Sequence, residues 1–155
     1  MYFPRQIERA GGGGVRLRFH EGEVLLLREL VDELEGLLED PDDPALRRLF
    51  PQAHDDPESE EQYRALVRDQ LLGGRSKAIA VVRDTLDKET LGPDEADAWL
   101  RALNDLRLVL GTRLEVTEDL DYENLDLNEP RGRDLAVYGY LTWLQEQLVE
   151  ALAEG

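Results

Sequence analysis

The stretch WLRALNDLRLVLGTRL, residues 99–114, decides the fold predicted for this chain. Its apolar residues recur every three or four positions, which places them on one face of an α-helix. The preceding Gly92-Pro93-Asp94 ends one helix and begins the next, because proline is favoured in a first helical turn. We therefore predict a helix from Pro93 to about Leu114 that packs through a stripe of Trp99, Leu103, Leu106, Leu110 and Leu114.

The same helix carries polar and small residues among its leucines, and these are the candidate site: Asn104, Asp105, Arg107, Gly111 and Arg113. Asn104, Arg107 and Gly111 are spaced i, i+3, i+7 and therefore share a face. Arg107 can pair with a carboxylate, and Gly111 allows another backbone to approach closely. Two interpretations stay open: a buried network that fixes the register of the helices, or a face that binds a partner.

Helical spacing of apolar residues continues on both sides of this stretch. It predicts helices at residues 23–39, 57–72, 76–91 and 133–153, and a short one at 43–50. Asp43-Pro44 and Asp56-Pro57 are N-cap and first-turn signals, and Gly73-Gly74 predicts a break or bend. The last helix is apolar on two sides, so it either lies centrally in the bundle or is shared with a second copy in a homodimer.

The N-terminus predicts a β-hairpin. Residues 2–9 and 15–20 alternate apolar and polar side chains on either side of four glycines, which form a flexible tip. Its polar side chains include Arg5, Arg16 and Arg18. The predicted fold is mainly α: a single domain, residues 1–155, with a β-hairpin at 1–20 and a bundle of five or six helices at 21–155.

The charge argues against direct DNA binding. The formal net charge is −17, and a strongly acidic protein repels the phosphates of nucleic acid at long range. Residues 1–20 contain four arginines and one glutamate, which gives this segment a charge of +3. The rest of the chain therefore carries a charge of −20. The hairpin is thus the only predicted anion-facing surface, and no predicted helix has the basic face of a recognition helix. We expect DNA to be reached only indirectly.

Composition excludes several other classes. The chain has no cysteine, so thiolate catalysis, thiolate zinc sites and disulfide switches are excluded. No apolar run approaches the roughly 18–20 residues that cross a bilayer, and the first residues do not read as a signal peptide. We therefore expect a cytoplasmic protein with no membrane contact.

Motifs for metal binding and catalysis are weak. The acidic residues 119–130 fail as a calcium loop, because Asn124 stands at the turn glycine and Pro130 at the last carboxylate. His54-Asp55-Asp56 cannot easily converge on one metal, and Asp56 serves better as an N-cap. The glycines at 11–14 lack the lysine and hydroxyl residue of a phosphate loop. We expect no cofactor, no metal and no enzymatic activity, although a carboxylate site is an alternative that sequence alone does not test.

Two blocks carry a resemblance to a known family. RLFPQAHDD at residues 48–56 supplies Leu49, Phe50, Pro51, Ala53, Asp55 and Asp56, and the helix quoted above supplies a pattern from Trp99 to Leu114. Together with the N-terminal strand pair, the acidic leucine helix and the Tyr/Trp/Leu-rich last helix, they resemble the actinobacterial AosR-like oxidative-stress transcriptional regulators. Members of this family lie beside the ClpS protease adaptor in many genomes.

The resemblance implies regulation by protein contact, with an extracytoplasmic-function sigma factor or RNA polymerase as the partner. It also implies a switch driven by cysteine oxidation, which a chain without cysteine cannot operate. The alternative implied by gene neighbourhood is an adaptor or accessory protein of the ClpS/Clp proteolysis pathway.

Overall fold

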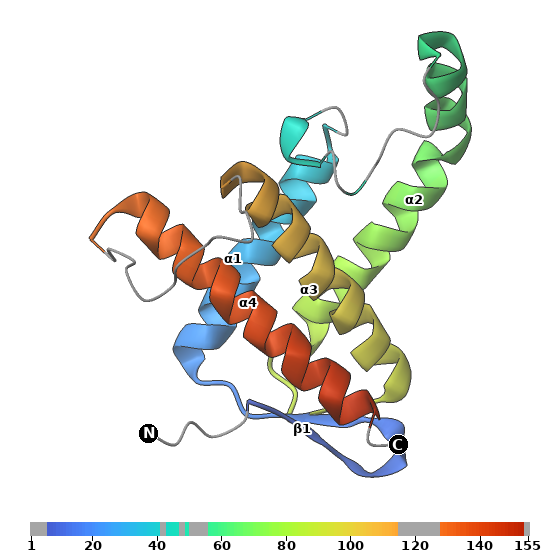
Figure 1. The fold of residues 1–155 in the computed structure, drawn as a ribbon. Coiled ribbons are helices and arrows are strands. Elements are labelled where there is room, and N and C mark those ends of the chain that lie inside the picture. The colour runs from blue at the N-terminus through green and yellow to red at the C-terminus, as the bar shows by residue number, and fades with distance from the viewer. Residues whose placement is uncertain (1–5, 41–42, 47–48, 50–55, 115–127, 154–155) are drawn as a thin grey trace.

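Four long helices stand on a small sheet (Figure 1). A computed structural model describes residues 6–40, 43–46, 49, 56–114 and 128–153, without the side chains of residues 60 and 64–71. The α-helices are α1 (Glu21–Leu38), α2 (Pro57–Thr85), α3 (Pro93–Leu114) and α4 (Pro130–Ala153). The strands are β1 (Ile7–Arg9), β2 (Val15–Leu17) and β3 (Thr90–Leu91), and two short 3-10 segments are η1 (Gly11–Gly13) and η2 (Pro44–Leu46). The prediction of a mainly α-helical fold with an N-terminal hairpin is confirmed.

The predicted N-caps are confirmed where they are described. The Asp56 carboxylate accepts hydrogen bonds from the backbone N–H of Ser59 at 3.3 Å and from its hydroxyl at 2.9 Å. Asp43 accepts from the Ala45 N–H at 2.8 Å. These bonds satisfy backbone donors that a helix start leaves unpaired, so both turns begin where the Asp-Pro pairs indicate.

The sheet has a third strand that the sequence analysis missed. Antiparallel β1 and β2 pair Ile7 with Leu17, and β2 pairs Val15 with Leu91 of β3. The helix predicted for residues 76–91 instead ends at Thr85, and the chain after it returns as the edge strand. Gly14 permits this contact, because a Cβ there would lie 2.2 Å from the carbonyl oxygen of Leu91.

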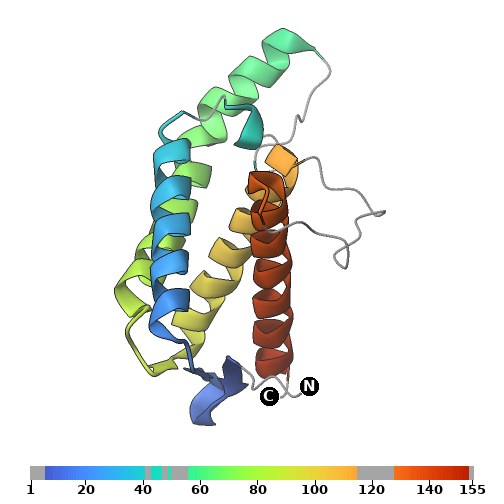
Figure 2. The same ribbon diagram turned by 90° about the vertical axis from the view of Figure 1, so that its left-hand side faces the viewer.

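The helix break predicted at Gly73-Gly74 does not occur. α2 runs without interruption from Pro57 to Thr85. Glycine lowers helix stability by about 1 kcal/mol relative to alanine but keeps its backbone hydrogen-bonding groups. The C-terminal half of α2 also buries Ile79 and Val82 in the core, which favours a continuous helix. In Figure 2 the N-terminal half of α2 extends beyond the other helices.

The centre of the bundle is α3, not the last helix. α3 contacts α1, α2 and α4, and it lies between α2 and α4 in Figure 1. Of its predicted stripe, Trp99, Leu103, Leu106 and Leu114 are buried and Leu110 is partly buried. α4 buries Leu135, Leu141, Leu144 and Leu148, while Trp143 is 37% exposed. Of the second apolar side of α4, Leu144 is buried, Tyr140 packs against the core and Trp143 is partly exposed, so the sharing of this helix with a second copy stays a prediction.

Among the described residues, no helix has both the length and the apolar character needed to span a membrane.

Candidate functional site

Arg107 and Asn104 join α3 to α4. The Arg107 guanidinium donates from Nε to the Thr142 hydroxyl at 3.1 Å and from Nη1 to the Gln145 side-chain oxygen. It also lies over the Tyr138 ring, 5.7 Å from the centroid. The Gln145 amide then donates to the Asn104 side-chain oxygen at 3.4 Å. Within the part of the chain that the structure describes, the partners of this pair therefore all belong to α4.

The oxygen that Arg107 contacts on Gln145 is an amide carbonyl and not a carboxylate. The guanidinium donates hydrogen bonds to neutral oxygens and lies over an aromatic ring. No carboxylate among the described residues pairs with it. Thr142 and Gln145 lie three positions apart on one face of α4, so two of its turns are held against α3. The geometry is that of a network that fixes how the two helices align.

Asp105 points instead toward α2. Its carboxylate is 3% exposed and accepts two hydrogen bonds from Nη1 of Arg75, at 3.0 and 3.1 Å. Arg75 also donates from Nη2 to the Leu49 carbonyl at 3.0 Å. Burial raises the pKa of Asp105 above its ordinary 3.8, and the positive charges of Arg75 and Arg101 offset part of that rise. The pair thus ties α3 to α2 and to the chain before α2.

The five candidate residues of α3 do not form one surface. Arg113 makes an ion pair with Glu33 of α1, and Gly111 is buried. Successive helical residues are separated by about 100°, so neighbours such as Asn104 and Asp105 face different elements. The candidate set therefore contacts all three of the other α-helices.

The basic hairpin residues lie apart from this set. Arg16 is exposed on β2, opposite Glu8 and Thr90 in the sheet register. Arg18 forms an ion pair with Glu8 at 3.2 Å. Arg5 falls outside the described residues, as do His54, Asp55 and most of the acidic segment 119–130. One of the predicted anion-facing arginines is therefore already neutralised within the sheet.

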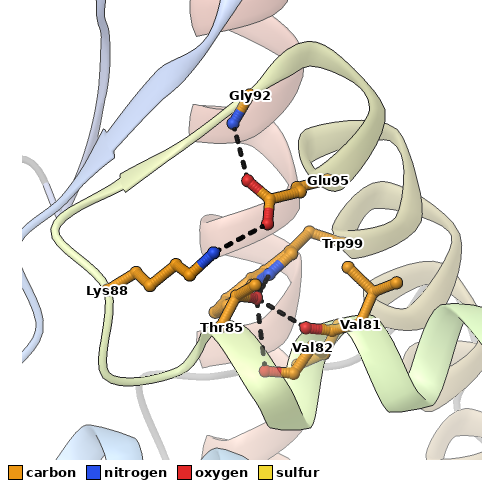
Figure 3. A network of polar contacts seen from close by, with 7 residues as sticks. All are labelled: Val81, Val82, Thr85, Lys88, Gly92, Glu95 and Trp99. Carbon is orange, nitrogen blue, oxygen red and sulfur yellow. Dashed lines mark hydrogen bonds and ion pairs between the residues drawn. The ribbon is translucent and has the colours of Figure 1, made fainter.

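A polar network at the base of α3 was not predicted (Figure 3). The Trp99 indole N–H donates to the Thr85 hydroxyl at 2.7 Å, and that hydroxyl donates to the Val81 carbonyl at 2.6 Å. Beside it, the Glu95 carboxylate accepts from the Gly92 N–H at 3.0 Å and from the Lys88 ammonium at 3.2 Å. The Gly92 hydrogen bond and Lys88 lower the pKa of Glu95. Glu95 is the third residue of α3 and lies three residues after Gly92, the position from which a carboxylate reaches back to the N–H that precedes the helix.

A second unpredicted junction centres on Glu23 at the start of α1. Its carboxylate accepts from the Gln6 side chain at 2.7 Å, from the His20 N–H at 3.2 Å and from the Tyr140 hydroxyl. Burial and the Glu23 charge raise the pKa of the Tyr140 phenol. Neutral Tyr140 therefore remains the donor that fixes α4 to α1.

No group of three or more His, Cys, Asp or Glu side chains among the described residues could hold a metal ion. The charged residues that approach burial, such as Asp105 and Arg75, are engaged between helices. The most exposed large apolar side chains among the described residues are Leu25 at 61% and Val149 at 47% exposure.

Comparison with known proteins defines the family. The profile of a domain of unknown function, DUF2017, matches residues 4–152, and the chain belongs to this family. Its relatives include proteins named oxidative stress regulator AosR in Mycobacterium bovis and Mycobacterium tuberculosis. Each is 30% identical to this chain, over 96% of it and 86% of the relative.

The alignment with these relatives spans 189 positions, more than the 155 residues of this chain, so they carry inserted segments. No solved structure shows a significant match.

Proposed function

We propose that this chain is an AosR-like transcriptional regulator of the oxidative stress response that acts by protein–protein contact. The observation that carries the proposal is its similarity, over nearly its whole length, to relatives named oxidative stress regulators. The proposed partner is an extracytoplasmic-function sigma factor or RNA polymerase. Such a role needs no catalytic group, which agrees with charged side chains that are engaged in helix contacts.

The surface charge supports a basic protein as the partner. The formal charge of −17 steers the chain toward basic protein surfaces and away from phosphates. We infer that DNA is reached through the partner alone.

The proposed regulator works without a thiol switch. The sequence has no cysteine, so neither a disulfide nor a sulfenic acid can form on it. Partner contact is therefore either constitutive or controlled by another signal.

Affinity capture from the native host tests the proposal. A tagged chain would be compared with an unrelated acidic helical protein of equal charge, and the recovered proteins quantified by mass spectrometry. Enrichment of a sigma factor or polymerase subunits, reproduced with the purified partner, is the expected result. Enrichment of Clp subunits would replace the proposal with the adaptor function, and enrichment of none of these would contradict both.

A further inference from the structure

A groove of about 560 Å³ opens where β2 ends, α1 begins and α2 connects to β3. Its apolar lining consists of Leu17, Phe19, Val24, Leu25 and Leu86. Leu17 and Leu86 are buried and form part of the core, whereas Leu25 is the most exposed large apolar side chain among the described residues. A leucine with 61% of its surface exposed adds little to the stability of its own fold. A partner that covered this side chain would gain the free energy of removing its apolar surface from water.

The floor of this groove is held in place by the network of Figure 3. The Phe19 ring stacks on Trp99 with centroids 5.8 Å apart and an interplanar angle of 14°. Trp99 is in turn fixed by its hydrogen bond to Thr85. The Leu17 N–H donates to the Glu89 carbonyl at 2.8 Å, and this bond joins the end of β2 to the segment that precedes β3. A preformed groove spares a partner the cost of ordering it.

The rim of the groove carries negative charge that no basic side chain in the described part of the chain neutralises. Its basic residues are each paired with a carboxylate: Arg18 with Glu8 at 3.2 Å, Arg28 with Asp87 at 3.5 Å, and Lys88 with Glu95 at 3.2 Å. Glu21 and Glu89 are exposed, and the described part of the chain provides no ion pair to either. The remaining charge at the rim is therefore that of two carboxylates.

We propose that this groove docks a short basic segment of a partner protein. An apolar side chain of the segment packs against Leu25 and Phe19, and lysine or arginine residues beside it face Glu21 and Glu89. The inference rests on the proposed function, for which it supplies the contact surface. A second copy is disfavoured as the occupant because both copies carry −17, and nucleic acid is disfavoured by the free carboxylates of the rim.

Peptide titration of the full chain, followed by amide chemical shifts, tests the docking. The probe is Lys-Arg-Leu-Phe-Lys-Arg, with Lys-Arg-Ala-Ala-Lys-Arg and Glu-Glu-Leu-Phe-Glu-Glu as matched peptides. The probe is expected to shift residues 17–28 and 86–89 and to bind at least tenfold more tightly than either matched peptide. Equal affinity for the two basic peptides, or shifts centred elsewhere, would overturn the proposal.

Matched variants separate the groove from general charge attraction. Leu25→Gln is expected to weaken probe binding at least fivefold, and Val149→Gln, at an exposed apolar position on α4, less than twofold. The double variant Glu21→Gln/Glu89→Gln should weaken binding more than Glu29→Gln/Glu146→Gln, which removes the same charge from exposed positions away from the groove lining. Thermal melts verify that all four variants fold, as exposed substitutions should. Equal effects within either matched pair would contradict docking at the groove.

Affinity capture with the same variants distinguishes this proposal from the proposed function. Sigma factor or polymerase recovered equally by wild type and Leu25→Gln would leave the function intact and overturn the groove. If wild type recovers neither while the peptide results hold, the function fails and the groove stands. Self-association lost on Leu25→Gln in sedimentation would assign the groove to a second copy and overturn the proposal.

Discussion

Asp105 of α3 lies 3.0 Å from the guanidinium of Arg75 on α2, and only 3% of Asp105 is exposed. Removing one partner of a buried ion pair leaves the other charge in a poorly solvated place. The Arg75 side chain is 24% exposed, so we expect Arg75→Ala to lower the free energy of unfolding by about 3 kcal/mol, the lower end for buried pairs.

Urea denaturation measures this effect, with Arg28→Ala as the matched control. Arg28 pairs with Asp87, whose side chain is 81% exposed, so its loss should cost no more than about 1 kcal/mol. Equal losses for the two variants would show that Asp105 does not depend on Arg75.

Glu95 gives the stability a defined pH dependence. The Gly92 N–H and Lys88 lower its pKa below the ordinary 4.5, so the folded chain releases this proton more readily than the unfolded chain. The stabilisation is therefore present above about pH 4.5 and is lost as the pH falls through the lowered pKa. In urea denaturation, the free energy of unfolding of the wild type should exceed that of Glu95→Gln, and the difference should be larger at pH 7 than at pH 3. A difference that does not change with pH would remove Glu95 from this role.

The sequence was sufficient to predict elements that depend on local patterns. The Pro93 helix, its buried Trp99 and the Asp56 cap follow from spacing and first-turn chemistry, which neighbouring residues determine. β3 was missed because a two-residue edge strand has no periodicity of its own and forms only by pairing with β2. The break predicted at Gly73-Gly74 did not occur because glycine weakens a helix without removing a backbone hydrogen bond, and α2 continues through both residues.

The candidate site shows the same division between local and distant information. Spacing correctly placed Asn104 and Arg107 on one face, and their shared network with Gln145 lies on that face. Spacing could not tell which element would face Asp105, since Arg75 lies 30 residues earlier in the chain. The groove around Leu25 was also not foreseen, because it is assembled from two segments distant in sequence, residues 17–28 and 86–89.

Arg107 provides a test of the α3–α4 contact. Its partners are neutral and the residue is partly buried, so Arg107→Ala should cost about 1.5–3 kcal/mol, the range for hydrogen bonds to a charged group. Arg9→Ala, at an exposed position on β1, is the control and should change the melting temperature little. A melting temperature unaffected by Arg107→Ala, together with lost partner capture, would assign Arg107 to the interface instead of the fold.

Peroxide should leave partner capture unchanged. No thiol is available to form a sulfenic acid or a disulfide, and the single methionine of the sequence, Met1, is the one sulfur that can be oxidised. Capture before peroxide, after peroxide and after added reductant would be compared, with intact mass as the check on oxidation. A change that the reductant reverses would reveal a sensing route that does not use this chain's sulfur chemistry.

DNA binding by the isolated chain should be weak at physiological salt. The charge of −17 repels phosphate, and Arg18 is already paired with Glu8, so Arg9 and Arg16 remain as a weak local attraction on the described part of the hairpin. Gel shifts with duplex DNA should detect no complex at sub-micromolar protein, and the double variant Arg16→Ala/Arg18→Ala should behave as wild type does. Tight binding that this variant abolishes would make the hairpin a true phosphate contact, and because such contacts release counterions, its affinity should then fall steeply with added salt.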